Sequence, residues 1–218
     1  MWQGVVPAGK GEVMKYIDLS QKIDSGIPVY PGDDGVSLVQ VKRLAEDHYN
    51  AYTLTTGLHA GTHIDCPMHL LDSSMVMADF SLDGFAGRGC LMDARGGMDI
   101  DYAEEYANII QKGDIVLIFT GMDAFYGSER YYSGHPAITE RLAHFLASRE
   151  IRMLGMDMPS PDYPPFPVHK SLLGKGIFIL ENLTGLEKLL GIKDFEVIAA
   201  PLKLCAEASL TRAFARCL

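Results

Sequence analysis

Histidines and a carboxylate gather in one short segment of the chain. Three of the seven histidines, His59, His63 and His69, lie within eleven residues that also contain Asp65. Imidazole nitrogens and carboxylate oxygens are good ligands for divalent transition metals. Burying this many ionisable groups together is costly unless a cation compensates them. The segment therefore predicts a metal site rather than a set of separately hydrogen-bonded histidines.

The spacing of these four residues also indicates their backbone conformation. On a helix, with about 100° per residue, His59 and His63 share a face while Asp65 and His69 point away from it. Pro67 further disfavours a helix through the segment. On a strand, all four positions have the same parity and can face one side. We therefore expect a strand that runs out into a loop.

A second pair of candidate ligands lies far downstream. His169 follows a proline-rich loop at 158–168, and Glu181 ends the apolar run 176–180. A carboxylate at the end of a buried strand is costly unless it is paired or ligated. Taken singly, the two residues could equally be a loop histidine and a surface glutamate. Spacing alone does not connect them to the first segment.

The segment HAGTHIDCPMH, at 59–69, resembles the H-x-G-T-H-x-D-x-P-x-H signature of the metal-dependent cyclase/hydrolase family that includes bacterial kynurenine formamidase. The match has no gap. It extends to Pro28–Gly32, to Gly155–Ser160, and to His169 with the run Glu181–Leu183. The resemblance thus covers nearly the whole chain from Tyr16 onward.

This resemblance implies a site with two divalent metal ions. The positions matching His59, His63 and Asp65 hold one ion, and Asp65 bridges to a second ion held at the positions matching His169 and Glu181. A donor set of nitrogen and oxygen without thiolate suits Zn(II) first and Mn(II) second. The family also implies a single-domain α/β fold of the swivelling β/β/α type, cyclase-like, and a homo-oligomer, either a dimer or a tetramer.

The resemblance makes His69 a catalytic histidine rather than mainly a ligand. Two adjacent metal ions polarise a carbonyl and activate water, and a nearby histidine can then transfer the proton. We therefore expect a metal-dependent hydrolase of a C–N amide bond, with N-formylkynurenine, an intermediate of tryptophan catabolism, as the substrate. Two alternatives remain open within the family: a cyclic amide such as a lactam or an isatin-like ring, and a small ester. A non-catalytic metal-binding protein is the alternative from another class, and it would have no use for His69.

The substrate pocket is less clearly indicated. Tyr30 stands where kynurenine formamidases commonly carry a tryptophan. Tyr30, Tyr163 and Phe166 could line an aromatic pocket, or they could simply anchor loops. This departure concerns the substrate and leaves the expected metal chemistry intact.

Alternating strands and helices must position these residues. Short apolar runs predict strands at 52–58, 89–93, 114–120, 152–156, 176–180 and 196–200. Capping patterns predict one helix from Asp101 to Gly113 and another beginning near Pro136, and a third is expected at 183–190. This alternation indicates a layered α/β fold.

Composition narrows the function classes. The 218 residues are 48% hydrophobic and 22% charged, as in globular proteins, and the net charge of −9 disfavours binding to nucleic acid. No apolar run reaches the length of a membrane span. Four cysteines without a CxxC pair are typical of a reducing cytoplasm. Residues 1–13 lack periodicity and are expected to be a leader that is either non-native or lies before a natural start at Met14. One domain at 14–218 is then expected to act on a small molecule.

Overall fold

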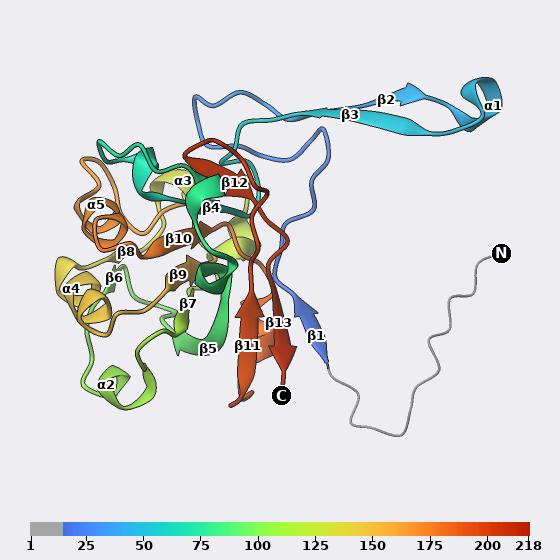
Figure 1. Cartoon of the computed structure of the whole chain (residues 1–218). Coiled ribbons are helices and arrows are strands. Elements are labelled where there is room, and N and C mark those ends of the chain that lie inside the picture. Colours follow the sequence, from blue (N-terminus) through green and yellow to red (C-terminus); the bar gives the residue numbers. More distant parts are fainter. Residues whose placement is uncertain (1–14) are drawn as a thin grey trace.

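A nine-stranded mixed sheet forms the centre of the computed structural model, which describes residues 15–218 (Figure 1). The suggested leader at 1–13 lies outside the described residues. Neighbouring strands follow the order β1-β13-β11-β5-β7-β9-β10-β4-β12, in which the four strands from β5 to β10 are mutually parallel and the other pairings are antiparallel. The strands are β1 (Tyr16–Asp18), β4 (His63–Asp65), β5 (Ala86–Asp93), β7 (Ile115–Phe119), β9 (Met153–Met156), β10 (Phe178–Glu181), β11 (Phe195–Ile198), β12 (Ala208–Leu210) and β13 (Phe214–Cys217).

The central strands are apolar on both faces because both faces are covered. All five residues of β7 are buried, and they alternate between two separate core clusters. Ile115 and Leu117 pack on one face, where residues from both ends of the sheet join them, so the sheet curls around that cluster. Val116 and Ile118 pack on the opposite face against helices. Strands buried on both sides read as continuous apolar runs, which is why the sequence indicated them.

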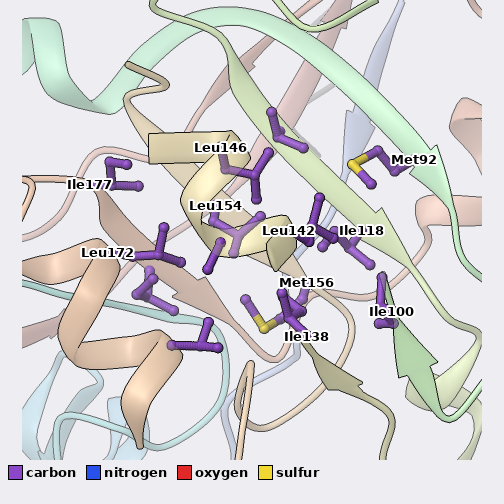
Figure 2. Packing of buried hydrophobic residues seen from close by; sticks show 14 of the residues in the cluster. Met92, Ile100, Ile118, Ile138, Leu142, Leu146, Leu154, Met156, Leu172 and Ile177 are labelled. Carbon is purple, nitrogen blue, oxygen red and sulfur yellow. The ribbon is translucent and has the colours of Figure 1, made fainter. Parts of the chain in front are cut away.

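Helices α4 (Glu140–Ser148) and α5 (Pro167–Leu173) cover the second face, and Figure 2 shows Leu142 and Leu146 of α4 directed at Leu154 and Ile118. The expected start of α4 near Pro136 is wrong. Ala137–Ile138 form the short strand β8, which pairs with β6 (Asp99–Ile100). The helix begins after Thr139, whose hydroxyl accepts a hydrogen bond from the Leu142 amide.

Two other expected helices are shorter than predicted. Between Asp101 and Gly113 only α2 (Tyr106–Ile109) forms, because the Asp101 carboxylate accepts a hydrogen bond from the distant Thr139 hydroxyl instead of capping a helix. The region 183–190 contains a single 3₁₀ turn, η5. The remaining short helices are α1 (Leu44–Asp47), α3 (Glu129–Ser133), η1 (Pro67–His69), η2 (Met77–Asp79), η3 (Leu82–Phe85), η4 (Met122–Phe125) and η5 (Leu186–Leu189).

A separate hairpin projects from the body of the molecule, with α1 near its tip (Figure 1). It consists of β2 (Ser37–Lys42) and β3 (Ala51–Thr55), so the strand expected at 52–58 exists but ends earlier and lies outside the main sheet. Its large apolar side chains are exposed, among them Val39, Val41, Leu44, Tyr52 and Leu54. No helix within residues 15–218 combines the length and apolar character needed to cross a membrane.

Candidate metal centre and active site

Strand pairing places three candidate ligands on one face of the sheet. His63 and Asp65 are two residues apart in β4, so their side chains point to the same side. β10 pairs antiparallel with β4 in a register that sets Glu181 directly opposite His63. Directly opposed residues have β-carbons about 5 Å apart, which is why residues distant in sequence meet here.

The other three candidates approach from the surrounding segments. His169 lies on α5 and is buried, with its helix packed over the same face of the sheet. His59 precedes β4 in a turn, and His69 ends η1 just after it. The strand is therefore shorter than the spacing suggested, but the structure brings all six predicted residues to one place.

Asp65 is at the centre of this cluster. Its Oδ1 lies 3.0 Å from His59 Nδ1 and 3.5 Å from His63 Nε2, and its Oδ2 lies 3.6 Å from His169 Nε2. Glu181 contributes its two oxygens at 3.3 Å from His63 Nε2 and 3.2 Å from His169 Nε2. The Asp65 carboxylate can therefore bridge these histidines, either through ion pairs or through bound metal ions.

Two sets of donor atoms are close enough to hold an ion each. One combines His59, Asp65 and His69, and the other combines His63, Asp65 and Glu181, with the donor atoms of each set within 4.8 Å of one another. Both sets contain Asp65, as a bridging ligand requires. The ring of His69 lies 4.3 Å from that of His59, so the geometry groups His69 with His59 more closely than the family resemblance implies.

Several buried polar atoms of this cluster have no hydrogen-bond partner in the described part of the chain. They are His63 Nε2, both carboxylate oxygens of Asp65, His169 Nε2 and Glu181 Oε1. Buried polar atoms without partners are rare and costly in folded proteins. Because all of these atoms are metal donors directed at one another, the residues present fit a divalent cation at this place.

The electrostatics of the cluster support the same conclusion. Burial opposes the charged form of His59, but the adjacent Asp65 carboxylate, with the charges of Glu181 and Glu207, raises the pKa of His59 to about 9. Burial also opposes ionisation of Asp65, yet the surrounding histidines hold the pKa of its carboxyl well below the usual value. By contrast, burial lowers the pKa of His69. The carboxylates thus require positive charge, which protons on histidine or a metal ion can supply.

Backbone and amide groups hold β4 in position. Nδ1 of His63 lies 2.9 Å from the carbonyl oxygen of Gly61, which also accepts a hydrogen bond from Asn182 Nδ2. The buried Tyr131 hydroxyl donates to Asn182 Oδ1 at 2.7 Å. Gly61 has φ of +64°, and a β-carbon there would lie 2.6 Å from Ile23 Cδ1, so only glycine fits.

A cavity of about 220 Å³ opens onto the cluster. Two of the expected pocket residues, Tyr30 and Phe166, line it, together with Tyr132, whose ring meets Tyr30 edge to face. Tyr163 has a different position: its ring stacks on His135 and its hydroxyl donates to the His135 carbonyl. The cavity therefore has aromatic walls above a polar, ionisable floor.

Three residues near the site were not selected from the sequence. Asp162 contacts His169, Asn182 contacts Gly61, and Oε1 of Glu207 lies 3.6 Å from His59 Nε2. None of them belongs to a periodic pattern, because each reaches the site from an irregular segment. The available signals were the proximity of Asp162 to His169 in sequence and the place of Asn182 within the run Glu181–Leu183 that matches the family.

Known proteins resemble this chain over most of its length. The family model Cyclase, described as "Putative cyclase", matches residues 17–163. A kynurenine formamidase from Erythrobacter litoralis (strain HTCC2594) is 32% identical over 205 residues, covering 91% of this chain and 92% of the relative.

Solved structures share the fold. A crystal structure of an isatin hydrolase bound to the product analogue thioisatinate matches with a TM-score of 0.83 at 22% identity, covering 93% of this chain and 92% of that one. A structure described as a "potential metal-dependent hydrolase with cyclase activity" matches with a TM-score of 0.77 at 26% identity, covering 94% and 98%. These matches confirm the expected α/β cyclase-like fold and the family resemblance. This chain therefore belongs to the cyclase family.

Proposed function

We propose that this protein is a metal-dependent amidohydrolase that cleaves the formamide C–N bond of N-formylkynurenine. The observation that carries the proposal is the cluster of buried donor atoms without hydrogen-bond partners, from His63, Asp65, His169 and Glu181. Three of these residues, His63, His169 and Glu181, line the floor of an aromatic cavity. The 32% identity to a kynurenine formamidase supports the choice of substrate.

The proposed ligands of the first ion are His59, His63 and Asp65, and those of the second are Asp65, His169 and Glu181. Zn(II) is the preferred ion and Mn(II) the alternative, because both accept nitrogen and oxygen donors. When bound, such ions polarise the carbonyl group and lower the pKa of water towards neutrality. His69 stands within reach of both proposed sets, since it lies beside His59 and its ring is 6.0 Å from that of His169.

His69 is the proposed proton-transfer group. Burial lowers its pKa, which favours the neutral imidazole that can accept a proton. In the reaction, the water oxygen bonds to the formyl carbon while His69 takes a proton from that water. The C–N bond then breaks, His69 returns the proton to the departing aryl amine, and formate and the amine are the products.

The cavity accommodates an aromatic substrate. Tyr30, Tyr132 and Phe166 supply apolar surface on which an aryl ring can pack, and the ionisable residues lie below it. A ring held between these walls would direct its formamide group to the floor. This arrangement favours an aryl formamide over a flexible aliphatic amide.

We also propose that the protein works as a homo-oligomer, a dimer or a tetramer, in the cytoplasm. The hairpin of β2 and β3 supports the oligomer, because a two-stranded hairpin is only marginally stable alone and this one exposes Val39, Val41 and Tyr52. All four cysteines are free, in keeping with a reducing compartment. Light scattering of the purified protein would measure the oligomer size.

A direct test uses purified protein loaded with zinc or manganese. We expect about two ions per chain and release of formate and kynurenine from N-formylkynurenine. Absence of bound metal after metal reconstitution would overturn the metal assignment. Full metal loading without turnover of N-formylkynurenine or a simple formanilide would overturn the substrate assignment alone.

A cyclic amide is the second candidate substrate, and one observation favours it. The described residues that line the cavity include no lysine or arginine. The α-carboxylate of N-formylkynurenine would therefore find no cationic partner there, whereas a neutral lactam or isatin-like ring needs none. Comparing kcat/KM for N-formylkynurenine, formanilide, isatin and a small aryl ester separates the amide substrates from each other and from an ester.

A non-catalytic metal-binding protein is the remaining alternative. A purely structural site has no need for His69 or for a cavity leading to the ions. Metal binding without hydrolysis of any member of that substrate panel would favour this alternative.

A further inference from the structure

Asp162 is a buried carboxylate beside the candidate metal centre, in the irregular segment between β9 and α5. Only 5% of the residue is exposed. The chain turns back after Asp162, so the carboxylate lies against the first turn of α5, which carries His169. Burying a carboxylate requires partners, and its two oxygens have different ones.

One oxygen holds the start of the helix. Oδ2 accepts a hydrogen bond of 2.7 Å from the backbone amide of Val168, one of the first-turn donors that has no partner within the helix. The other oxygen faces the histidine: Oδ1 lies 3.2 Å from His169 Nδ1. The carboxylate therefore connects the backbone of α5 to the ring that the helix carries.

This contact decides which nitrogen of His169 faces the metal centre. An ionised carboxylate only accepts hydrogen bonds, so Nδ1 must carry the proton that it donates to Asp162. Nε2 is then the nitrogen directed at Asp65 Oδ2 and Glu181 Oε1, and it has no hydrogen-bond partner among the described residues. His63 is oriented similarly, but by the backbone carbonyl of Gly61.

We propose that Asp162 is a positioning residue that fixes the ring orientation and proton position of His169, so that Nε2 is available to a metal ion. The proposal rests on the proposed metal-dependent function. Histidine ligands commonly donate their second ring N–H to such a carboxylate, and losing it weakens metal binding about 10- to 100-fold. Glu207 holds His59 less firmly than Asp162 holds His169, since the Glu207 side chain is 38% exposed and its Oε1 lies 3.6 Å from His59 Nε2.

An asparagine at this position separates the two roles of the carboxylate. The amide oxygen of Asp162→Asn can still accept from the Val168 amide, but its NH₂ group then faces His169 Nδ1. Two donors would meet, so Nδ1 would have to become an acceptor and Nε2 would carry the proton. The start of α5 is preserved, while a proton on Nε2 competes with the metal ion for that nitrogen. Asp162→Ala removes both contacts. Tyr163→Phe controls for disturbance of the segment, because it loses the hydrogen bond from the Tyr163 hydroxyl to the His135 carbonyl and leaves the side-chain contacts of Asp162 and His169 in place.

The experiment measures zinc affinity and stoichiometry by competition with a chelating dye, the visible spectrum of the Co(II)-loaded protein, and the Tm of the metal-free protein. We expect Asp162→Asn to keep the metal-free Tm of the parent, to bind one of its two zinc ions 10- to 100-fold more weakly, and to show an altered Co(II) spectrum. Asp162→Ala should share the loss of affinity and also lower the Tm, and Tyr163→Phe should match the parent in affinity.

Two results would overturn the inference on its own. One is a zinc affinity of Asp162→Asn that lies within threefold of the affinity of the parent protein. The other is a metal-free Tm that falls as far in Asp162→Asn as in Asp162→Ala, because the carboxylate would then serve only the helix. A parent protein that binds no zinc would overturn the proposed function as well, so the two failures are distinguishable.

Discussion

Removing the metal should destabilise the folded protein by a predictable amount. A ligand that binds only the folded state at 100 times its Kd adds about 2.7 kcal/mol to the free energy of unfolding. For a chain of this size, 1 kcal/mol corresponds to about 2–4 °C in Tm, so each occupied site should raise the Tm by about 5–11 °C. Glu181 is the residue on which to test this, because it is buried and contacts both His63 and His169.

Substituting Glu181→Gln keeps the side-chain size and removes the charge. If zinc binding weakens a hundredfold, the same zinc concentration equals the new Kd and adds only about 0.4 kcal/mol. The zinc-induced rise in Tm at that site should then shrink to about 1–2 °C. Glu187→Gln is the matched control, since it makes the same change at an exposed glutamate a few residues away and should retain the full response.

The assay uses calorimetry to measure the Tm of chelator-treated protein, with and without added zinc. A full zinc response in Glu181→Gln would refute the assignment of Glu181 as a ligand. The absence of any zinc response in the parent protein would refute the argument from unpartnered donor atoms, because those atoms would then be stable without a cation.

Three further changes test the site and the fold. His69→Ala should lower kcat about 10²- to 10⁴-fold while the metal content measured by mass spectrometry stays at the parent value; a parallel loss of metal would make His69 a ligand. Tyr30→Ala should raise KM for aryl substrates severalfold with little change in kcat in steady-state assays, because it removes a cavity wall; a fall in kcat at constant KM would contradict that role. Gly155→Ala should destabilise the protein by about 1–3 kcal/mol in urea unfolding, since the new β-carbon would lie 2.6 Å from Leu117 Cδ2 and 3.1 Å from Leu183 Cδ1. An unchanged urea midpoint would show that the neighbouring side chains can move to make room.

The sequence predicted the central sheet and the candidate ligands better than it predicted the helices. The runs at 114–120 and 152–156 are recognisable because strands covered on both faces are continuously apolar. The helix expected from Asp101 is shortened for a non-local reason: the side chain of Asp101, expected to cap it, bonds to Thr139, far along the chain. Local capping patterns cannot anticipate such a competing partner.

In the candidate site too, the contacts within one segment could be predicted from the sequence, and the contacts between distant segments could not. The grouping of His59, His63 and Asp65 follows from their spacing in a single segment. The meeting of His63 with Glu181 depends on the pairing of β4 with β10, which spacing along the chain does not reveal. The role inferred for Asp162 depends on a turn that returns the chain to α5. It follows from the contacts of both carboxylate oxygens, with Val168 and His169, which the sequence does not reveal.

The pairing of β4 with β10 also determines where the chain can gain or lose residues. Side chains alternate between the faces of a strand, so deleting one residue between Phe178 and Glu181 would turn the terminal carboxylate to the opposite face of the sheet. A residue inserted at the tip of the hairpin formed by β2 and β3 changes no pairing in the main sheet. Natural length variation among relatives should therefore collect in that hairpin and be absent from the two strands that meet at the cluster.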